Sequence, residues 1–182
     1  MELRRAKDYL PVPDPFDPFW REMTKKDIHR RFLDQLAKDL EAITVSAKAS
    51  FATATDDEHR AEHKYDTFKL ESSFLARGQA KRVDDLTEAL ESLRMLPVKA
   101  LPKGSPVQLG ALVRLKADDG ATRTLLFGSA AGGEMLLDDG EEITVVTSRS
   151  PLGEAVLGKV AGETFKIKIG PTLQTFKVLS VT

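Results

Sequence analysis

One stretch of this chain, residues 24–96, contains no proline and only one glycine, Gly78. Proline and glycine are the residues that most often interrupt helices, so this stretch can form long, continuous helices. Thr24, with Asp27 three residues later, is predicted to cap the start of the first helix. Apolar or small residues then recur at steps of four and three, which places them on one helical face. They are Ile28, Phe32, Leu36, Leu40, Ile43, Ala47, Phe51 and Ala54.

A second apolar stripe follows a polar interval. Its members are Phe68, Leu75, Val83, Leu86, Leu90 and Leu93. Two helices of this size would each span about 45 Å, at a rise of 1.5 Å per residue. Since neither helix has another apolar face, the stripes predict that the helices pack on each other as an antiparallel coiled-coil hairpin over residues 24–96. The polar interval, "TDDEHRAEHKYDT", then forms an acidic tip near residues 56–66, with the turn near residues 56–62.

The rest of the chain differs in composition and in the pattern of its apolar residues. Residues 1–23 hold four of the nine prolines and are expected to form an irregular N-terminal arm, anchored by Phe16, Phe19 and Trp20. Residues 97–106, with three prolines and Gly104, are expected to be a linker. Beyond it, residues 107–182 alternate apolar and polar residues as strands do. The predicted fold class is therefore α+β, with the hairpin first and a compact β-rich domain second.

Turn signals divide this second domain. "DDG" occurs at residues 118–120 and again at 138–140, each between two candidate strands, and "GPT" at 170–172 separates the last two. Between them, Ser150 is a candidate N-cap, Pro151 fits the first helical position and Gly158 can end a short helix. "GSAAGGE" at residues 128–134 has neither the lysine nor the helix start of a phosphate loop, so we interpret it as a strand connection.

Composition limits the function. Net charge is −1, so no global field attracts nucleic acid or an anionic membrane. There is no cysteine, which excludes disulfides and thiolate metal sites. The N-terminus has no apolar signal region and no window resembles a transmembrane helix, so we expect a cytoplasmic protein without membrane association. His59 and His63, spaced i, i+4, lack a defined third ligand for zinc and are interpreted as a solvated pair.

The carboxylates of the acidic tip are more informative. Glu62 and Asp66 are spaced i, i+4 and would project side by side from the start of the second helix, where the helix dipole favours acids. The dipole does not explain why Asp57 and Glu58, with Asp56, lie so near. Like charges at a free tip repel unless they share a cation, and oxygen-rich clusters suit Mg²⁺. The tip could therefore complete a metal site within another macromolecule.

The segment "SPLGEAVLGKVAGETFKIKIG" resembles the C-terminal signature of the bacterial Gre family of transcription elongation and transcript cleavage factors (GreA/GreB). Ten positions carry the resemblance. They are Ser150, Pro151, Leu152, Gly153, Ala155, Leu157, Gly158, Lys159, Gly162 and Glu163. The resemblance extends over roughly residues 24–182 and is clearest from residue 143 onwards.

This resemblance implies an N-terminal coiled coil and a C-terminal FKBP-like antiparallel β-sheet domain with a short helix. It implies that the domain docks on bacterial RNA polymerase, with contacts from Ser150, Pro151, Leu152, Gly153 and Lys159. The coiled coil would enter the secondary channel, and Glu62 and Asp66, with Asp57 and Glu58 nearby, would act at the polymerase Mg²⁺ to stimulate cleavage of backtracked RNA. The chain would then be an accessory factor, not an enzyme, with no cofactor of its own. DNA binding is also associated with the family.

The tip departs from the family pattern. It has no asparagine, Tyr65 comes one position early, and His59 stands where the tip aspartate belongs. A close alternative is therefore a DksA-like or anti-Gre regulator that occupies the channel without stimulating cleavage. Basic residues of the second helix are candidates for contact with nascent RNA, although such residues more often form a solvated face. They are Lys69, Arg77, Lys81 and Arg82.

Two more distant functions remain. A peptidyl-prolyl isomerase would need an aromatic pocket floor, for which residues 97–182 offer only Phe127, Phe165 and Phe176. A coiled-coil scaffold or dimer is the other, but the hairpin already uses both apolar stripes, so we expect a monomer.

Overall fold

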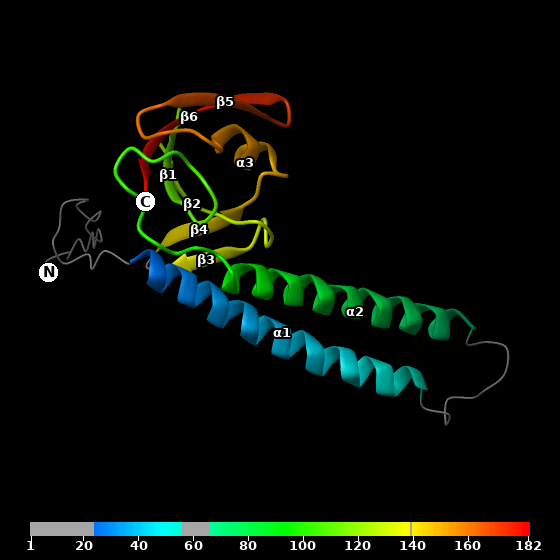
Figure 1. Cartoon of the computed structure of the whole chain (residues 1–182). Coiled ribbons are helices and arrows are strands. Elements are labelled where there is room, and N and C mark those ends of the chain that lie inside the picture. Colours follow the sequence, from blue (N-terminus) through cyan, green and yellow to red (C-terminus); the bar gives the residue numbers. More distant parts are fainter. Residues whose placement is uncertain (1–23, 56–65, 139) are drawn as a thin grey trace, which may run out of the picture.

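The computed structural model describes residues 24–55, 66–138 and 140–182 (Figure 1). Two long helices come first and a six-stranded sheet with one short helix follows. The elements are α1 Lys25–Thr55, α2 Asp66–Arg94, β1 Leu112–Ala117, β2 Thr122–Phe127, β3 Met135–Asp138, β4 Glu141–Val146, α3 Pro151–Val156, β5 Thr164–Ile169 and β6 Thr172–Val181. The α+β layout predicted from the sequence is confirmed. The expected N-terminal arm (1–23) and most of the acidic tip, including the turn near residues 56–62, lie outside the described residues.

The first helix begins where the capping pattern predicts. Thr24 N–H and Thr24 Oγ1–H donate to Asp27 Oδ2 at 3.2 and 2.7 Å, and Asp27 N–H donates back to Thr24 Oγ1 at 3.3 Å. This reciprocal arrangement satisfies backbone donors that the first turn of a helix leaves free. With 31 and 29 residues, α1 and α2 are each roughly 45 Å long at 1.5 Å per residue.

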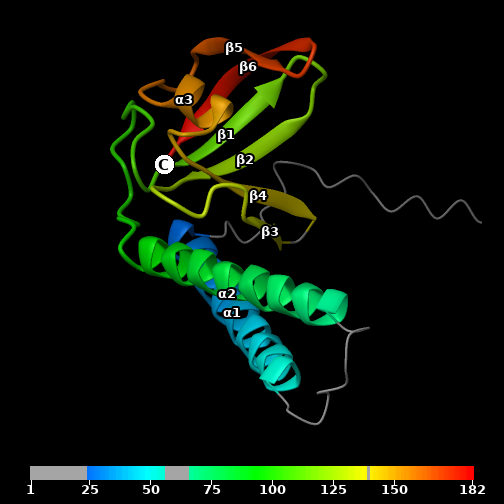
Figure 2. The ribbon, with the colours of Figure 1, turned by 90° about the vertical axis from the view of Figure 1, so that its right-hand side faces the viewer.

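The two helices pack closely at the end nearest the sheet. Phe32 and Leu36 of α1 and Leu86 and Leu93 of α2 are almost completely buried there. Towards the other end the helices diverge, which is clear from the side in Figure 2. Two open grooves of about 330 and 370 Å³ flank the interhelical contact in the middle of the pair. None of the described helices combines the length and the apolar character that a bilayer-spanning segment needs.

The second apolar stripe is shorter than predicted. Leu75 is 59% exposed and therefore does not pack in the hairpin. One turn further on, the interhelical contact is polar, because Gln79 Nε2 donates to Ser46 Oγ at 3.1 Å. The second stripe, which the sequence already shows to be less regular around Gly78, is interrupted at this point, since a polar pair at the interface replaces the apolar contact that would draw the helices together.

The sheet is mixed, with strand order β3-β4-β2-β1-β6-β5. Four of its neighbouring pairs are antiparallel, including the predicted hairpins β1–β2 and β5–β6. The pair β2–β4 is parallel, with Thr124 opposite Ile143 and Phe127 opposite Val146. The expected all-antiparallel sheet is thus corrected. The segment 128–134 crosses from β2 to the edge strand β3, and the β3–β4 hairpin then returns β4 alongside β2 in the same direction.

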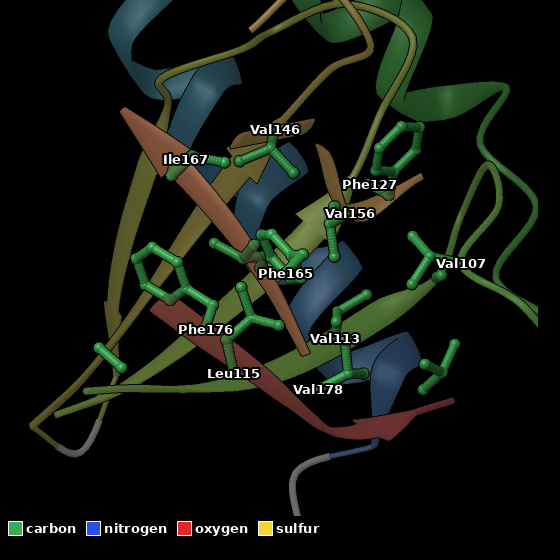
Figure 3. Close-up of a cluster of buried hydrophobic side chains, with 14 residues drawn as sticks. Val107, Val113, Leu115, Phe127, Val146, Val156, Phe165, Ile167, Phe176 and Val178 are labelled. Carbon is green, nitrogen blue, oxygen red and sulfur yellow. The ribbon is translucent and has the colours of Figure 1, made fainter. Parts of the chain in front are cut away.

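Each face of the sheet carries its own apolar cluster. On one face, strand residues such as Leu115, Phe127 and Phe176 pack with Val156 of α3 (Figure 3). On the other, Leu126 and residues of β3 and β4 pack with the proximal residues of α1 and α2. Because neighbouring strand residues point to opposite faces, the run Leu125-Leu126-Phe127 supplies both clusters.

The hairpin therefore packs on the sheet as well as on itself, which corrects the prediction that its stripes serve only the interhelical contact. Polar contacts reinforce the attachment. Lys25 Nζ donates to the carbonyl oxygens of Lys99 and Gly110 at 2.8 and 3.0 Å, and burial lowers the pKa of Lys25. Arg82 forms an ion pair with Glu134 at 3.3 Å. The base of the hairpin is thus fixed to the globular part of the molecule.

Candidate docking surface around α3

The segment that carries the Gre resemblance begins with a capped helix. Ser150 has extended backbone angles (φ −92°, ψ 147°), and its Oγ accepts from Gly153 N–H at 3.1 Å. The same hydroxyl donates to the carbonyl oxygen of Thr147 at 3.0 Å. Pro151 occupies the first turn of α3, where a missing backbone donor costs nothing. The sequence prediction of an N-cap at Ser150 followed by a helix-initiating proline is confirmed.

Gly153 is fixed by its surroundings rather than by its backbone angles. A Cβ atom at this position would lie 2.0 Å from the carbonyl oxygen of Thr147 and 2.9 Å from Ser150 Oγ. Both neighbours are held in place, since Ser150 Oγ–H donates to that same carbonyl oxygen. The α3 helix can approach the end of β4 this closely only with glycine at position 153.

The end of α3 is attached to the start of the sheet domain by backbone hydrogen bonds. Gly158, at φ +77°, donates its N–H to Val107 O at 2.9 Å, and Val107 N–H donates to Lys159 O at 2.8 Å. Positive φ is a conformation that glycine adopts readily and other residues rarely do. Val156 and Val107 are both buried beneath this contact. The glycine of the signature's "LGK" is therefore a structural requirement.

Glu163 closes the turn that follows. Its Oε2 accepts from Val160 N–H at 2.7 Å and its Oε1 accepts from Lys159 Nζ at 3.4 Å. The hydrogen bond from Val160, together with the positive charge of Lys159, holds the pKa of Glu163 below its usual range. The glycine–acid pair of the signature, Gly162 (φ +95°) and Glu163, thus shapes the entry to β5.

This lowered pKa predicts a pH dependence of stability. A carboxyl whose pKa is lower in the folded than in the unfolded state stabilises the fold above its unfolded pKa, about 4.3, and this contribution disappears as the pH falls through the folded value. We therefore expect Glu163→Gln to be less stable than the wild type at pH 7. The difference in unfolding free energy, measured by urea titration monitored by circular dichroism, should shrink below about pH 4. A difference that grows on acidification would contradict this role.

The structure separates the five residues predicted to contact a partner. Gly153 is buried, while Ser150 and Leu152 are half-buried, the latter against the core cluster of Figure 3. Pro151 is exposed, and Lys159 is partly exposed with its Nζ engaged by Glu163. Gly153, Ser150 and Leu152 therefore shape the surface from within. Pro151 and Lys159 lie on it.

One residue on this surface was not among the predicted contacts. Leu157, the C-cap residue of α3, is 46% exposed, whereas Val156 before it is fully buried. Arg149, just before α3, and Glu154, within it, are also exposed. The signature itself includes Leu157, the C-cap residue that follows the six-residue α3, but no local pattern indicates its exposure. A single exposed leucine is common on protein surfaces and does not identify a contact by itself.

The tip residues predicted to act on the polymerase are only partly placed. Asp57, Glu58 and Glu62 lie outside the described residues, and Asp66 begins α2. The structure does describe the two helices on either side of the tip, α1, which ends at Thr55, and α2, which begins at Asp66. Carboxylates are suitable ligands for Mg²⁺. Within the described ranges, no cluster of three or more His, Cys, Asp or Glu residues could hold a metal ion.

The basic residues of α2 differ from one another in their contacts. Arg82 forms an ion pair with Glu134, although half of its side chain stays exposed. Arg77 and Lys81, four residues apart, are exposed on α2 and are available to a partner. The structure does not favour a peptidyl-prolyl isomerase, because Phe127, Phe165 and Phe176 are buried in the core and do not line an open pocket. The rings of Phe165 and Phe176 stack there, with their centroids 5.7 Å apart (Figure 3).

No protein-family model matches the chain, and no curated protein matches it. Among solved structures, Gfh1 of Thermus aquaticus is similar at 17% identity, with a TM-score of 0.35 over 81% of this chain and 92% of that one. The GreA factor homolog 1 (Gfh1) of Thermus thermophilus matches at 18% identity and a TM-score of 0.35, over 82% and 94%. A GreA/GreB elongation factor of Nitrosomonas europaea matches at 17% identity and 0.32, over 65% and 95%. With identities and TM-scores this low, the function of the chain has to come from its own residues.

Proposed function

We propose that this chain is a Gre-type factor that binds bacterial RNA polymerase and extends its helical hairpin through the secondary channel to the active centre. The observation that carries the proposal is the segment 150–163, which bears the Gre signature and forms a capped, tightly closed helix and turn beside an exposed leucine. The second support is the hairpin, whose base is fixed to the same globular unit by apolar and polar contacts.

In this proposal the two parts of the molecule have separate tasks. Pro151, Leu157 and Lys159 contribute the docking contacts on the outside of the polymerase. The hairpin, about 45 Å long, carries the acidic residues over a distance that no surface loop could bridge. A fixed base matters because a mobile hinge would leave the position of the tip undefined. The factor acts as a monomer in the cytoplasm, where the polymerase is found.

At the tip, Glu62 and Asp66 are the residues that we propose to act, with Asp57 and Glu58 as the nearby alternatives. Their carboxylates would orient water and help to hold the polymerase Mg²⁺, the ion that activates water for phosphodiester cleavage. The reaction is then that of the polymerase, cleavage of backtracked RNA, and this chain is an accessory factor with no cofactor of its own.

A second candidate function keeps the docking but not the stimulation of cleavage. The sequence of the tip favours it, because the asparagine of the family pattern is missing and His59 stands in place of an aspartate. A histidine cannot offer the negative charge that an aspartate gives to Mg²⁺. Such a factor would occupy the channel and slow RNA synthesis.

One assay separates the two functions. Backtracked elongation complexes carrying end-labelled RNA are incubated with Mg²⁺, with and without the wild-type protein, and the RNA products are resolved on a gel. The first function predicts shortened RNA that can be extended again when nucleotides are added. The second predicts no additional cleavage and slower synthesis in the same complexes. A protein that neither alters cleavage nor synthesis, and does not bind the polymerase, would refute both.

A further inference from the structure

The sheet has an exposed basic face that neither the hairpin nor α3 covers. Strands β1, β6 and β5 are neighbours at the end of the sheet away from α1 and α2 (Figures 1 and 2). Their buried residues point into the cluster of Figure 3, and the residues between them point outwards. The outward residues include five exposed cations, which we call the basic face. They are Arg114, Lys116, Lys166, Lys168 and Lys177.

Two of these lysines lie directly opposite each other. Lys116 of β1 pairs with Lys177 of β6 in the antiparallel register. Like charges in this position destabilise a sheet. Lysines on an edge strand can be explained as protection against edge-to-edge aggregation, which accounts for Lys166 and Lys168 on β5. That explanation does not apply to Lys116 and Lys177, because β1 and β6 are interior strands.

Neutralising partners are scarce on the basic face. Arg114 forms an ion pair with Glu141 at 3.0 Å. Asp118, at the end of β1, accepts from Thr175 N–H at 3.1 Å. Among the described residues, no carboxylate forms an ion pair with Lys116, Lys166, Lys168 or Lys177. A local excess of positive charge therefore exists on a chain whose net charge is −1.

The residues between the cations indicate what they would bind. Leu173 and Leu179, which share the outward side of β6 with Lys177, are 59% and 44% exposed. Apolar residues with charged neighbours are typical of protein contact surfaces. Surfaces that bind single-stranded nucleic acid combine cations with aromatic side chains for stacking, and none of the outward-facing residues described on these three strands is aromatic.

We propose that the basic face, with Leu173 and Leu179, binds an acidic protein surface that presents apolar residues between its carboxylates. This inference is independent of the proposed function, since it concerns a different face from that of α3 and needs no polymerase. It also explains the pairing of Lys116 with Lys177. That pairing weakens the free sheet and is relieved when carboxylates approach.

Lys177→Glu tests the proposal while leaving the fold intact. It places a carboxylate opposite Lys116, so the variant should melt at the same temperature as the wild type or higher. Lys103→Glu is the matched control, because Lys103 is also exposed but lies in the segment before β1. The probes are a short fluorescent peptide of glutamates interspersed with leucines, the same peptide with serine for leucine, and a single-stranded oligouridine. Binding to the full chain is measured by anisotropy and by amide chemical shifts.

The glutamate–leucine peptide should bind the wild type and the control alike and shift amides of β1, β5 and β6. Lys177→Glu should weaken it about tenfold, the effect of replacing an attraction with a repulsion. The serine peptide should bind more weakly than the leucine peptide. Shifts confined to other elements, or equal binding of both peptides, would overturn the proposal. So would tighter binding of oligouridine than of the peptide at the same face, which would identify a nucleic-acid surface instead.

Discussion

Replacing Gly153 by alanine is expected to lower the free energy of unfolding by about 3 kcal/mol, the upper end of the cost of overpacking a tight site. The reason is the distance of 2.0 Å from the new Cβ to the carbonyl oxygen of Thr147, well inside van der Waals contact. The neighbouring atom belongs to the backbone and cannot turn away as a side chain could. Either α3 or the end of β4 must move, and Ser150 then loses its capping geometry.

Gly78→Ala is the matched control for this substitution. Gly78 lies within α2 and a Cβ atom there would meet nothing within 4 Å. Because alanine is the better helix former, the control should gain about 0.5–1 kcal/mol. Urea unfolding monitored by circular dichroism gives both values. Equal effects of the two substitutions would contradict the packing of α3 described above.

The second large effect is expected from Phe32→Ala, which should destabilise the protein by about 3–5 kcal/mol. Phe32 is 1% exposed and lies in the cluster that α1 and α2 share with β2, β3 and β4. Its removal leaves a cavity at the joint between the hairpin and the sheet, so the cost includes both the lost transfer energy and the cavity.

Phe74→Ala makes the same chemical change at a position that is 63% exposed on α2. It should alter the unfolding free energy by no more than about 0.5 kcal/mol. The ratio of the two effects, taken from the same denaturation series, tests whether the base of the hairpin packs on the sheet. A cost of under about 1 kcal/mol for Phe32→Ala would show that it does not.

Local signals in the sequence predicted most of the elements. The capping pattern at Thr24 and Asp27 marked the start of α1, and Ser150-Pro151 marked the start of α3, because caps depend only on neighbouring backbone groups. The turns "DDG" at residues 118–120 and "GPT" correctly indicated hairpins. These are short-range effects, and a single sequence contains them completely.

Long-range relations were harder to predict. The parallel pairing of β2 with β4 depends on where the crossover segment 128–134 leads, which no local pattern specifies. The stripe of Phe32 and Leu36 correctly indicated burial but not the partner, and the sheet proved to be part of it. One available signal was overlooked, since the apolar run Leu125-Leu126-Phe127 indicates a strand buried on both faces.

At the candidate site, too, local structure could be predicted from the sequence, whereas properties that depend on long-range packing could not. The signature predicted a folded unit around α3, and the structure shows that Gly153, Gly158 and Glu163 serve this local geometry. The family resemblance implied a contact role for Gly153, because a motif does not distinguish residues that shape a surface from those that lie on it. Leu157 could be recognised as exposed only once α3 was packed against the sheet.

The central claim, that the hairpin delivers carboxylates to the active centre of RNA polymerase, is tested most directly at the tip. The double variant Glu62→Ala/Asp66→Ala is compared with Asp85→Ala/Glu88→Ala, which removes two exposed carboxylates from the base half of α2. Binding to the polymerase and cleavage of backtracked RNA are measured on the same preparations. The account predicts that the tip variant binds as the wild type does but no longer stimulates cleavage, while the control retains both activities. Stimulation that survives in the tip variant, or that the control loses equally, would contradict it.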